Sequence, residues 1–140
     1  MNATRRALIV EDLDFWQDTL REILTDAGYQ VWIAASCAEA LDALAQRPYQ
    51  LAMIDPVLDD VNRHNRDGLR VLQYILEHHP EMCAMVVTSS DPKHIRREVA
   101  DISDEMSADM SVDIPVLWKD EWDDAQFLSL LRAHVGPTYP

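Results

Sequence analysis

Acidic, hydroxyl and basic side chains follow four short apolar segments of the sequence, at the point where each segment ends. These residues are Glu11, Asp12, Asp55, Thr88 and Lys119. Carboxylates held close together repel one another unless a cation lies between them, and hard oxygen ligands suit Mg²⁺. A metal ion, a lysine and a hydroxyl group around a carboxylate supply what phosphoryl transfer needs, which is neutralised charge and a nucleophilic acid. The residue types therefore indicate magnesium-dependent phosphoryl transfer, provided that the fold brings them together.

The apolar segments themselves predict the strands of a sheet. They are ALIV (7–10), VWIA (31–34), LAMI (51–54), AMVV (84–87) and PVLW (115–118). None of them alternates cleanly with polar residues. Continuous apolar strands of this length are typical of a parallel sheet that is covered on both faces.

Amphipathic patterns between the strands predict five helices. The first runs from Trp16 to Ala27 and stops at Gly28, and the second has an N-cap at Ser36 and ends before Pro48. The third runs from Leu69 to His78, and the fourth begins near Asp91 and Pro92. The last runs from about Trp122 to Val135 and is closed by Gly136. Strands that alternate with helices predict a three-layer α/β sandwich of the flavodoxin-like type. In the common strand order 2-1-3-4-5, the first and third strands are neighbours and ligands bind where the order reverses. Glu11, Asp12 and Asp55 are therefore expected to lie together.

Length and composition fit one soluble domain. We expect residues 1–140 to form a single domain with a core over about 7–135 and no effector domain. No apolar run approaches the length needed to span a bilayer, and the acids at 11 and 12 end the first apolar stretch too early for a signal peptide. The expected location is cytoplasmic. Cys37 and Cys83 have no metal-ligand spacing and are read as reduced structural residues.

The charge of the chain limits its partners. A net charge of −13 disfavours binding to nucleic acid, whose phosphates would repel it. The segment 101–124 holds nine acids and one base, Lys119. It is read either as a solvated acidic face or as a docking face for a basic partner.

Four motifs resemble those of the receiver domain of two-component response regulators. They are ALIVED, LAMIDP, VVTSS and VLWKD, in this order and on these strands, and the resemblance extends from Leu8 to about Val135. It implies that Asp55 is the phosphoacceptor, that Asp12 binds Mg²⁺ directly, and that Glu11 does so through water. The backbone carbonyl of Val57 would be a further ligand. Thr88 would hydrogen-bond the phosphoryl group, and Lys119 would pair with it.

The resemblance also implies partners and chemistry. A histidine kinase or a phosphotransfer protein would supply the phosphoryl group, and output would pass through an unknown downstream protein, with 101–124 as a candidate contact. Activity would be limited to self-phosphorylation from a donor and autodephosphorylation.

Some features depart from the family pattern. The loop over 56–66 is extended, and its Asp59, Asp60 and His64 are read as polar surface groups in preference to extra metal ligands. Val116 stands where many receivers have the aromatic residue that moves on activation. A degenerate receiver that only docks proteins is therefore an alternative. A haloacid-dehalogenase-like phosphatase is a weaker one, because that family needs a second acid where this chain has Val57, which cannot move a proton.

Overall fold

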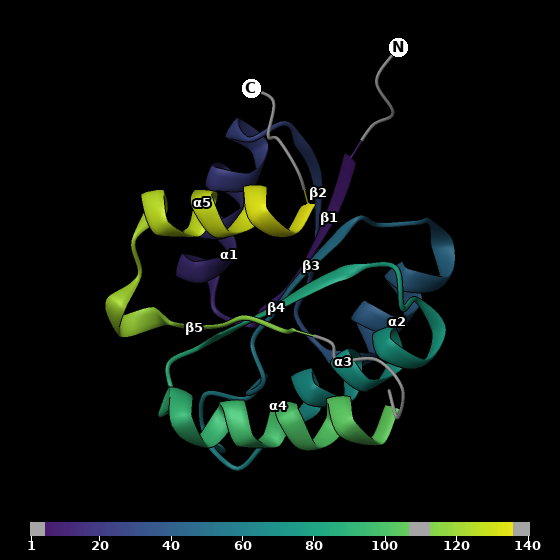
Figure 1. The fold of residues 1–140 in the computed structure, drawn as a ribbon, viewed down its shortest axis with the longest axis vertical. Coiled ribbons are helices and arrows are strands. Elements are labelled where there is room, and N and C mark those ends of the chain that lie inside the picture. Colours follow the sequence, from purple (N-terminus) through teal and green to yellow (C-terminus); the bar gives the residue numbers. More distant parts are fainter. Residues whose placement is uncertain (1–4, 107–112, 136–140) are drawn as a thin grey trace.

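The computed structural model describes residues 5–106 and 113–135, and they form a five-stranded parallel sheet between two layers of helices (Figure 1). The strands are β1 (Arg5–Val10), β2 (Tyr29–Ala34), β3 (Leu51–Ile54), β4 (Cys83–Thr88) and β5 (Val116–Trp118). Their order is β2-β1-β3-β4-β5, and every neighbouring pair is parallel. The predicted strands, their order and the α/β class are thus confirmed.

Helices cover both faces of the sheet. They are α1 (Asp14–Asp26), α2 (Cys37–Gln46), α3 (Asp67–His78), α4 (Pro92–Met106) and α5 (Asp124–Val135). One core cluster joins Ala7 and Ile9 of β1 to apolar residues of α1 and α5, while a second joins Leu8 and Val10 to residues of α2, α3 and α4. Alternate side chains of one strand therefore enter different cores, which explains why the strand is apolar throughout. Figure 1 shows α1 and α5 together on one side of the sheet.

Local signals set the predicted helix ends in two places. The Ser36 hydroxyl accepts a hydrogen bond from the Glu39 amide at 3.2 Å, as an N-cap does. Gly28 follows α1 with a φ of 98°, which suits glycine at the end of a helix. Both ends were predicted from the sequence.

The start of the last helix was predicted too early. Residues Lys119–Glu121 form a short 3-10 helix, η1, and α5 begins at Asp124, so Trp122 lies between the two. The Asp123 carboxylate accepts a hydrogen bond from the Ala125 amide at 2.9 Å and caps α5. Gly136 lies outside the described residues.

Neither cysteine forms a disulfide among the described residues. Cys37 and Cys83 are free and half-buried, and burial raises the pKa of the Cys83 thiol to about 11, which fits an unreactive residue. Within 5–106 and 113–135, none of the helices has the length and apolar character needed to cross a membrane.

Candidate functional site

The register of the central strands brings the three predicted acids to one edge of the sheet. Val10 and Ile54 are partners in the β1–β3 pair, so Glu11 and Asp55 leave adjacent strands at the same level. The Asp55 amide donates to the Val10 carbonyl at 2.9 Å, and the Glu11 amide donates to the Ala34 carbonyl at 3.0 Å. Carboxylate oxygens of Glu11, Asp12 and Asp55 lie within 4.8 Å of one another. Two of these side chains are buried, with Glu11 only 1% and Asp55 only 6% exposed.

Lys119 places a cation against two of the acids. It follows β5 at the start of η1, and its Nζ contacts Glu11 Oε1 and lies 2.8 Å from Asp55 Oδ2. The ammonium also lies 5.1 Å from the centre of the Trp16 ring, a distance typical of a cation–π contact. Burial of this lysine is therefore balanced by two carboxylates and one aromatic face.

Burial and like charge shift the carboxyl groups of the site. Burial raises the pKa of Glu11 to about 8, with the Asp55 charge adding to the effect and the Lys119 charge opposing it. Burial is also the largest cause that raises the pKa of Asp12, and the charges of Asp55 and Asp60 raise it further. Both carboxyl groups would hold their protons less tightly beside an added cation, because positive charge favours the ionised form.

Backbone contacts hold the Asp55 carboxylate. The Val57 amide donates to Asp55 Oδ1 at 2.9 Å, so Val57 contacts the carboxylate through its N–H, and a ligand role for its carbonyl stays a prediction. Gly68, in the first turn of α3, packs directly on this segment: its amide donates to the Pro56 carbonyl at 3.1 Å. A Cβ at position 68 would overlap the backbone carbonyl of Asp55. Only glycine allows α3 to start so close to the acid.

Thr88 completes the predicted set at the end of β4. Its side chain is fully buried, and its Oγ1 accepts a hydrogen bond from the Ser90 amide at 3.0 Å. Thr88 pairs in register with Trp118, so Lys119 leaves β5 one residue further along. All five predicted side chains therefore gather at the carboxyl ends of β1, β3, β4 and β5.

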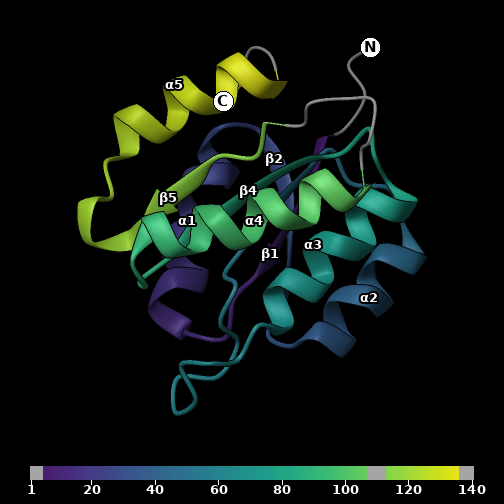
Figure 2. The same cartoon turned by 60° about the horizontal axis from the view of Figure 1, so that its bottom comes forward.

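The extended loop between β3 and α3 adds a residue that the sequence did not indicate. Asp59 Oδ1 accepts from the Val61 and Asn62 amides at 3.0 and 3.2 Å, which shapes a turn, and His64 is exposed. Among the described residues, the group that could hold a metal includes none of Asp59, Asp60 and His64. Arg63, by contrast, reaches the β4–α4 turn and donates to the hydroxyls of Ser89 and Ser90. In the sequence, the one sign of such a contact was the length of the loop. Figure 2 shows this loop projecting beyond the sheet near the start of α1.

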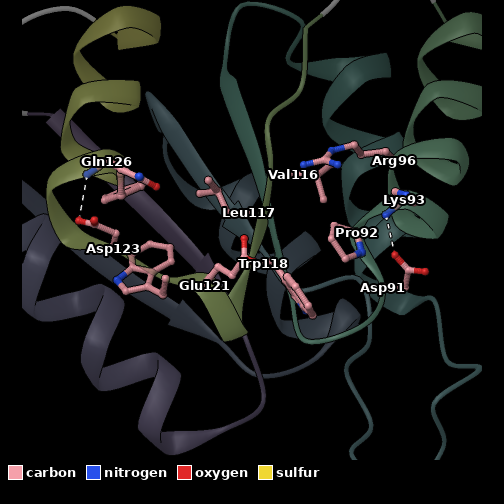
Figure 3. A pocket seen from close by; sticks show the side chains of 12 residues that line it. Asp91, Pro92, Lys93, Arg96, Val116, Leu117, Trp118, Glu121, Asp123 and Gln126 are labelled. Carbon is pink, nitrogen blue, oxygen red and sulfur yellow. Dashed lines mark hydrogen bonds between the residues drawn. The ribbon is translucent and has the colours of Figure 1, made fainter.

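A groove of about 420 Å³ lies between α4 and α5 over β5 (Figure 3). Lys93 and Arg96 line it from α4, while Glu121 and Asp123 line it from the segment before α5. Trp118 lies in the groove and immediately precedes Lys119. None of the clustered acids lines it, so the groove is separate from the site but joined to it through β5.

The sequence model of the response regulator receiver domain matches residues 7–106, which is more than half of the chain. The chain belongs to this family. Among curated proteins, a putative NtrX-like response regulator of Rickettsia bellii (strain RML369-C) is 30% identical over 81 residues, covering 58% of this chain and 16% of that protein. The receiver domain thus matches only a small part of that relative.

Solved structures of receiver domains share the fold of this chain. The CheY-like receiver domain protein from Methanospirillum hungatei JF-1 is 25% identical, with a TM-score of 0.74 over 95% of this chain and 94% of that one. The receiver domain of NtrX from Brucella abortus has a TM-score of 0.74 at 19% identity, over 92% of this chain and 97% of that one, and shows the shared fold. The predicted family and fold are therefore both confirmed.

Proposed function

We propose that this receiver domain accepts a phosphoryl group on Asp55 in a Mg²⁺-dependent reaction. The donor would be a phosphohistidine of a histidine kinase or of a phosphotransfer protein. The observation that carries the proposal is the pairing of a buried, backbone-held Asp55 with Lys119, beside Glu11 and Asp12. A carboxylate fixed in this way can act as a nucleophile whose products are held by a nearby cation.

The donor set suits the proposed metal. Three carboxylates whose oxygens lie within 4.8 Å of one another provide hard ligands, and the partly exposed Asp12 leaves room for waters, which Mg²⁺ retains. Glu11, Asp12, Asp55 and the Val57 carbonyl would hold the ion. When bound, it would supply positive charge to the oxygens of the transferred group.

The residues of the chain have separate roles in the proposed transfer. A carboxylate oxygen of Asp55 attacks the phosphorus, the phosphorus–nitrogen bond of the donor breaks, and its electron pair returns to the imidazole. The Val57 amide and Lys119 fix the orientation of the carboxylate before the attack. Lys119 and the Thr88 hydroxyl then contact the new phosphoryl oxygens, and burial keeps these contacts strong. Subsequent attack of water on phosphorus restores the acid and releases phosphate.

Output would pass through a partner protein. The acid-rich segment 101–124 is proposed as its contact, and the acids of this segment that the structure describes are exposed. Residues 107–112 of the segment lie outside the described residues. A basic surface on the partner would complement this charge.

A second candidate function is a receiver that docks proteins without using phosphorylation. It is favoured by Val116, which is 8% exposed in β5 and has no aromatic ring to move between two positions. Either function predicts a folded domain with a docking face, so only the chemistry of Asp55 separates them.

Intact mass after incubation with acetyl phosphate and Mg²⁺ tests the proposal. We expect the mass to rise by one phosphoryl group, the group to be labile to hydroxylamine, and both Asp55→Asn and chelation of Mg²⁺ to prevent the change. Asp59→Asn is the matched control, since this nearby aspartate is used in a loop turn and labelling should be unaffected. A wild type that stays unmodified, or an Asp55→Asn variant that labels normally, would contradict the assignment.

A further inference from the structure

The loop between β3 and α3 carries a guanidinium group to the rim of the site. Arg63 Nη2 donates to Ser89 Oγ at 2.9 Å and to Ser90 Oγ at 3.0 Å. These two serines directly follow Thr88, and the Ser90 amide donates to Thr88 Oγ1. Arg63 therefore contacts the same short turn that holds the buried hydroxyl of the site.

The positive charge of Arg63 is not balanced by a carboxylate. Across residues 5–106 and 113–135, no acid lies within ion-pairing distance of it, whereas Arg66 in the same loop pairs with Glu98 at 3.0 Å. The Arg63 side chain is exposed, and the two groups to which it donates are neutral hydroxyls. A guanidinium has five N–H donors in a flat fork, so several remain for an anion, and this geometry matches phosphate oxygens.

The loop that presents Arg63 is organised by its own contacts. Arg66 Nη1 donates to the carbonyls of Arg63 and Asn65 at 2.9 and 2.8 Å. Asn65 Oδ1 accepts from the Leu58 amide at 3.0 Å, which closes the loop at its base. Through Glu98, Arg66 also fixes the loop to α4. These bonds limit the positions that the guanidinium can adopt, so less order has to be imposed when it binds a ligand.

The loop comes near the site at two points, one at Asp12 and one at the turn after Thr88. Asp60 lies close enough to Asp12 for their charges to interact, while Arg63, three residues later, lies at the Ser89–Ser90 turn. The turn that Arg63 contacts begins directly after Thr88, a residue of the proposed site. The chain has a net charge of −13, which repels phosphate donors, so a cation at the entrance has a clear electrostatic effect on their approach.

We infer that Arg63 is a recognition residue for the phosphoryl group, which it binds from the Ser89–Ser90 side as the donor enters. The inference rests on the proposed phosphorylation of Asp55 and assigns that reaction an additional residue. Lys119 contacts the acids within the buried site, whereas Arg63 supplies charge at its mouth. The two serines hold the guanidinium in place and leave its remaining donors for the phosphoryl oxygens.

Initial rates of phosphorylation by acetyl phosphate at saturating Mg²⁺ test the inference. Arg63→Gln should raise the half-saturating acetyl phosphate concentration by about two- to fivefold, within the range expected of an exposed charge pair. The maximal rate should change little, because Arg63 acts on binding of the donor. Arg63→Lys should restore most of the affinity. Arg70→Gln is the matched control: it removes the same charge from an exposed position on α3 and should behave as the wild type.

The pair of Arg63 variants separates charge from structure. Glutamine keeps N–H donors for the serine hydroxyls without the charge, while lysine keeps the charge without the planar fork. A normal half-saturating concentration in Arg63→Gln, or a defect in Arg63→Lys as large as that in Arg63→Gln, would overturn the inference. In both cases, if the wild type still gains a phosphoryl group, the proposed phosphorylation of Asp55 is not contradicted. A wild type that takes no phosphoryl group would overturn both.

Added salt provides an independent readout. Salt screens exposed charges, and Arg63→Gln lacks one attraction that salt can screen, so added NaCl should raise the half-saturating concentration of the wild type relative to that of Arg63→Gln. Equal slopes in the two proteins would contradict a charge role for Arg63. Melting temperatures of all variants, which should match the wild type within a few degrees for an exposed position, establish that the differences do not come from unfolding.

Discussion

Lys119 Nζ lies 2.8 Å from Asp55 Oδ2, although the two residues are 64 positions apart and both side chains are nearly inaccessible to water. The same nitrogen contacts Glu11 Oε1, so one ammonium group balances two buried acids from adjacent strands. Lys119 therefore links the stability of the fold to the chemistry of the site.

Replacing Lys119 should destabilise the protein strongly. Lys119→Met leaves two buried carboxylates without their cation, and we expect a loss of about 3 kcal/mol in the free energy of unfolding. Urea denaturation at pH 8 with a chelator present measures it. The double variant Lys119→Met/Asp55→Asn should recover part of the loss, since it replaces one of the two buried carboxyl groups that lose their cation. Lys93→Met, at an exposed position of α4, serves as the control, and a loss equal to that of Lys119→Met would contradict the explanation.

The raised pKa of Glu11 predicts a pH dependence of stability. The pKa of Glu11 is about 8 in the folded chain and 4.5 in a model peptide, so between these values the folded state holds a proton that the unfolded state has released. Stability without metal should therefore fall as pH rises through this window, by up to about 1.4 kcal/mol per pH unit from this group. Glu11→Gln should remove that contribution. Denaturation midpoints of both proteins from pH 5 to pH 8 decide the matter, and parallel curves would refute the prediction.

Asp12 should control the response of the protein to Mg²⁺. Saturating Mg²⁺ should stabilise the wild type by mass action, by about 2.7 kcal/mol when its concentration is a hundred times the Kd. Asp12→Ala should lose most of this gain. Without metal the same variant should be more stable than the wild type by about 1 kcal/mol, because it relieves repulsion between carboxylates. Thermal unfolding with and without Mg²⁺ measures both effects. Asp26→Ala, at the far end of α1, controls for lost charge, and an equal Mg²⁺ shift in Asp12→Ala and the wild type would place the metal elsewhere.

The positions of the strand-end residues could be predicted from the sequence because strand order and register leave few alternatives. Once Val10 and Ile54 are aligned, Glu11 and Asp55 must be neighbours. The contact of Arg63 with the β4–α4 turn could not be predicted, because a loop of this length has many paths and its hydrogen bonds depend on the path taken. The start of the last helix was predicted two residues too early for a different reason. The cap at Asp123 is a weak signal among several neighbouring acids.

The structure also bears on how long a phosphoryl group on Asp55 would last. Hydrolysis needs a water aligned behind the phosphorus, and the resemblance to receiver domains places the residues that orient it at Val57 and Ser90. Val57 is 3% exposed and offers no side-chain hydrogen bond, while the Ser90 hydroxyl already accepts from Arg63. The acid at 59, which could have folded back to orient a water, instead accepts two amides of its own loop.

We therefore expect a long-lived phosphorylated state, and Val57→Asn should shorten it. An amide at this position can hold a water near the phosphorus, and we expect loss of phosphate to become about tenfold faster, below the roughly 10²- to 10⁴-fold that a full general base contributes. Phosphorylation by acetyl phosphate should change little, because the backbone N–H that orients Asp55 remains. A time course of phosphate loss at saturating Mg²⁺ measures the rate, with Val61→Asn, at a 90% exposed position of the same loop, as the control. A wild type that loses phosphate as fast as Val57→Asn would show that another group of the loop already orients the water.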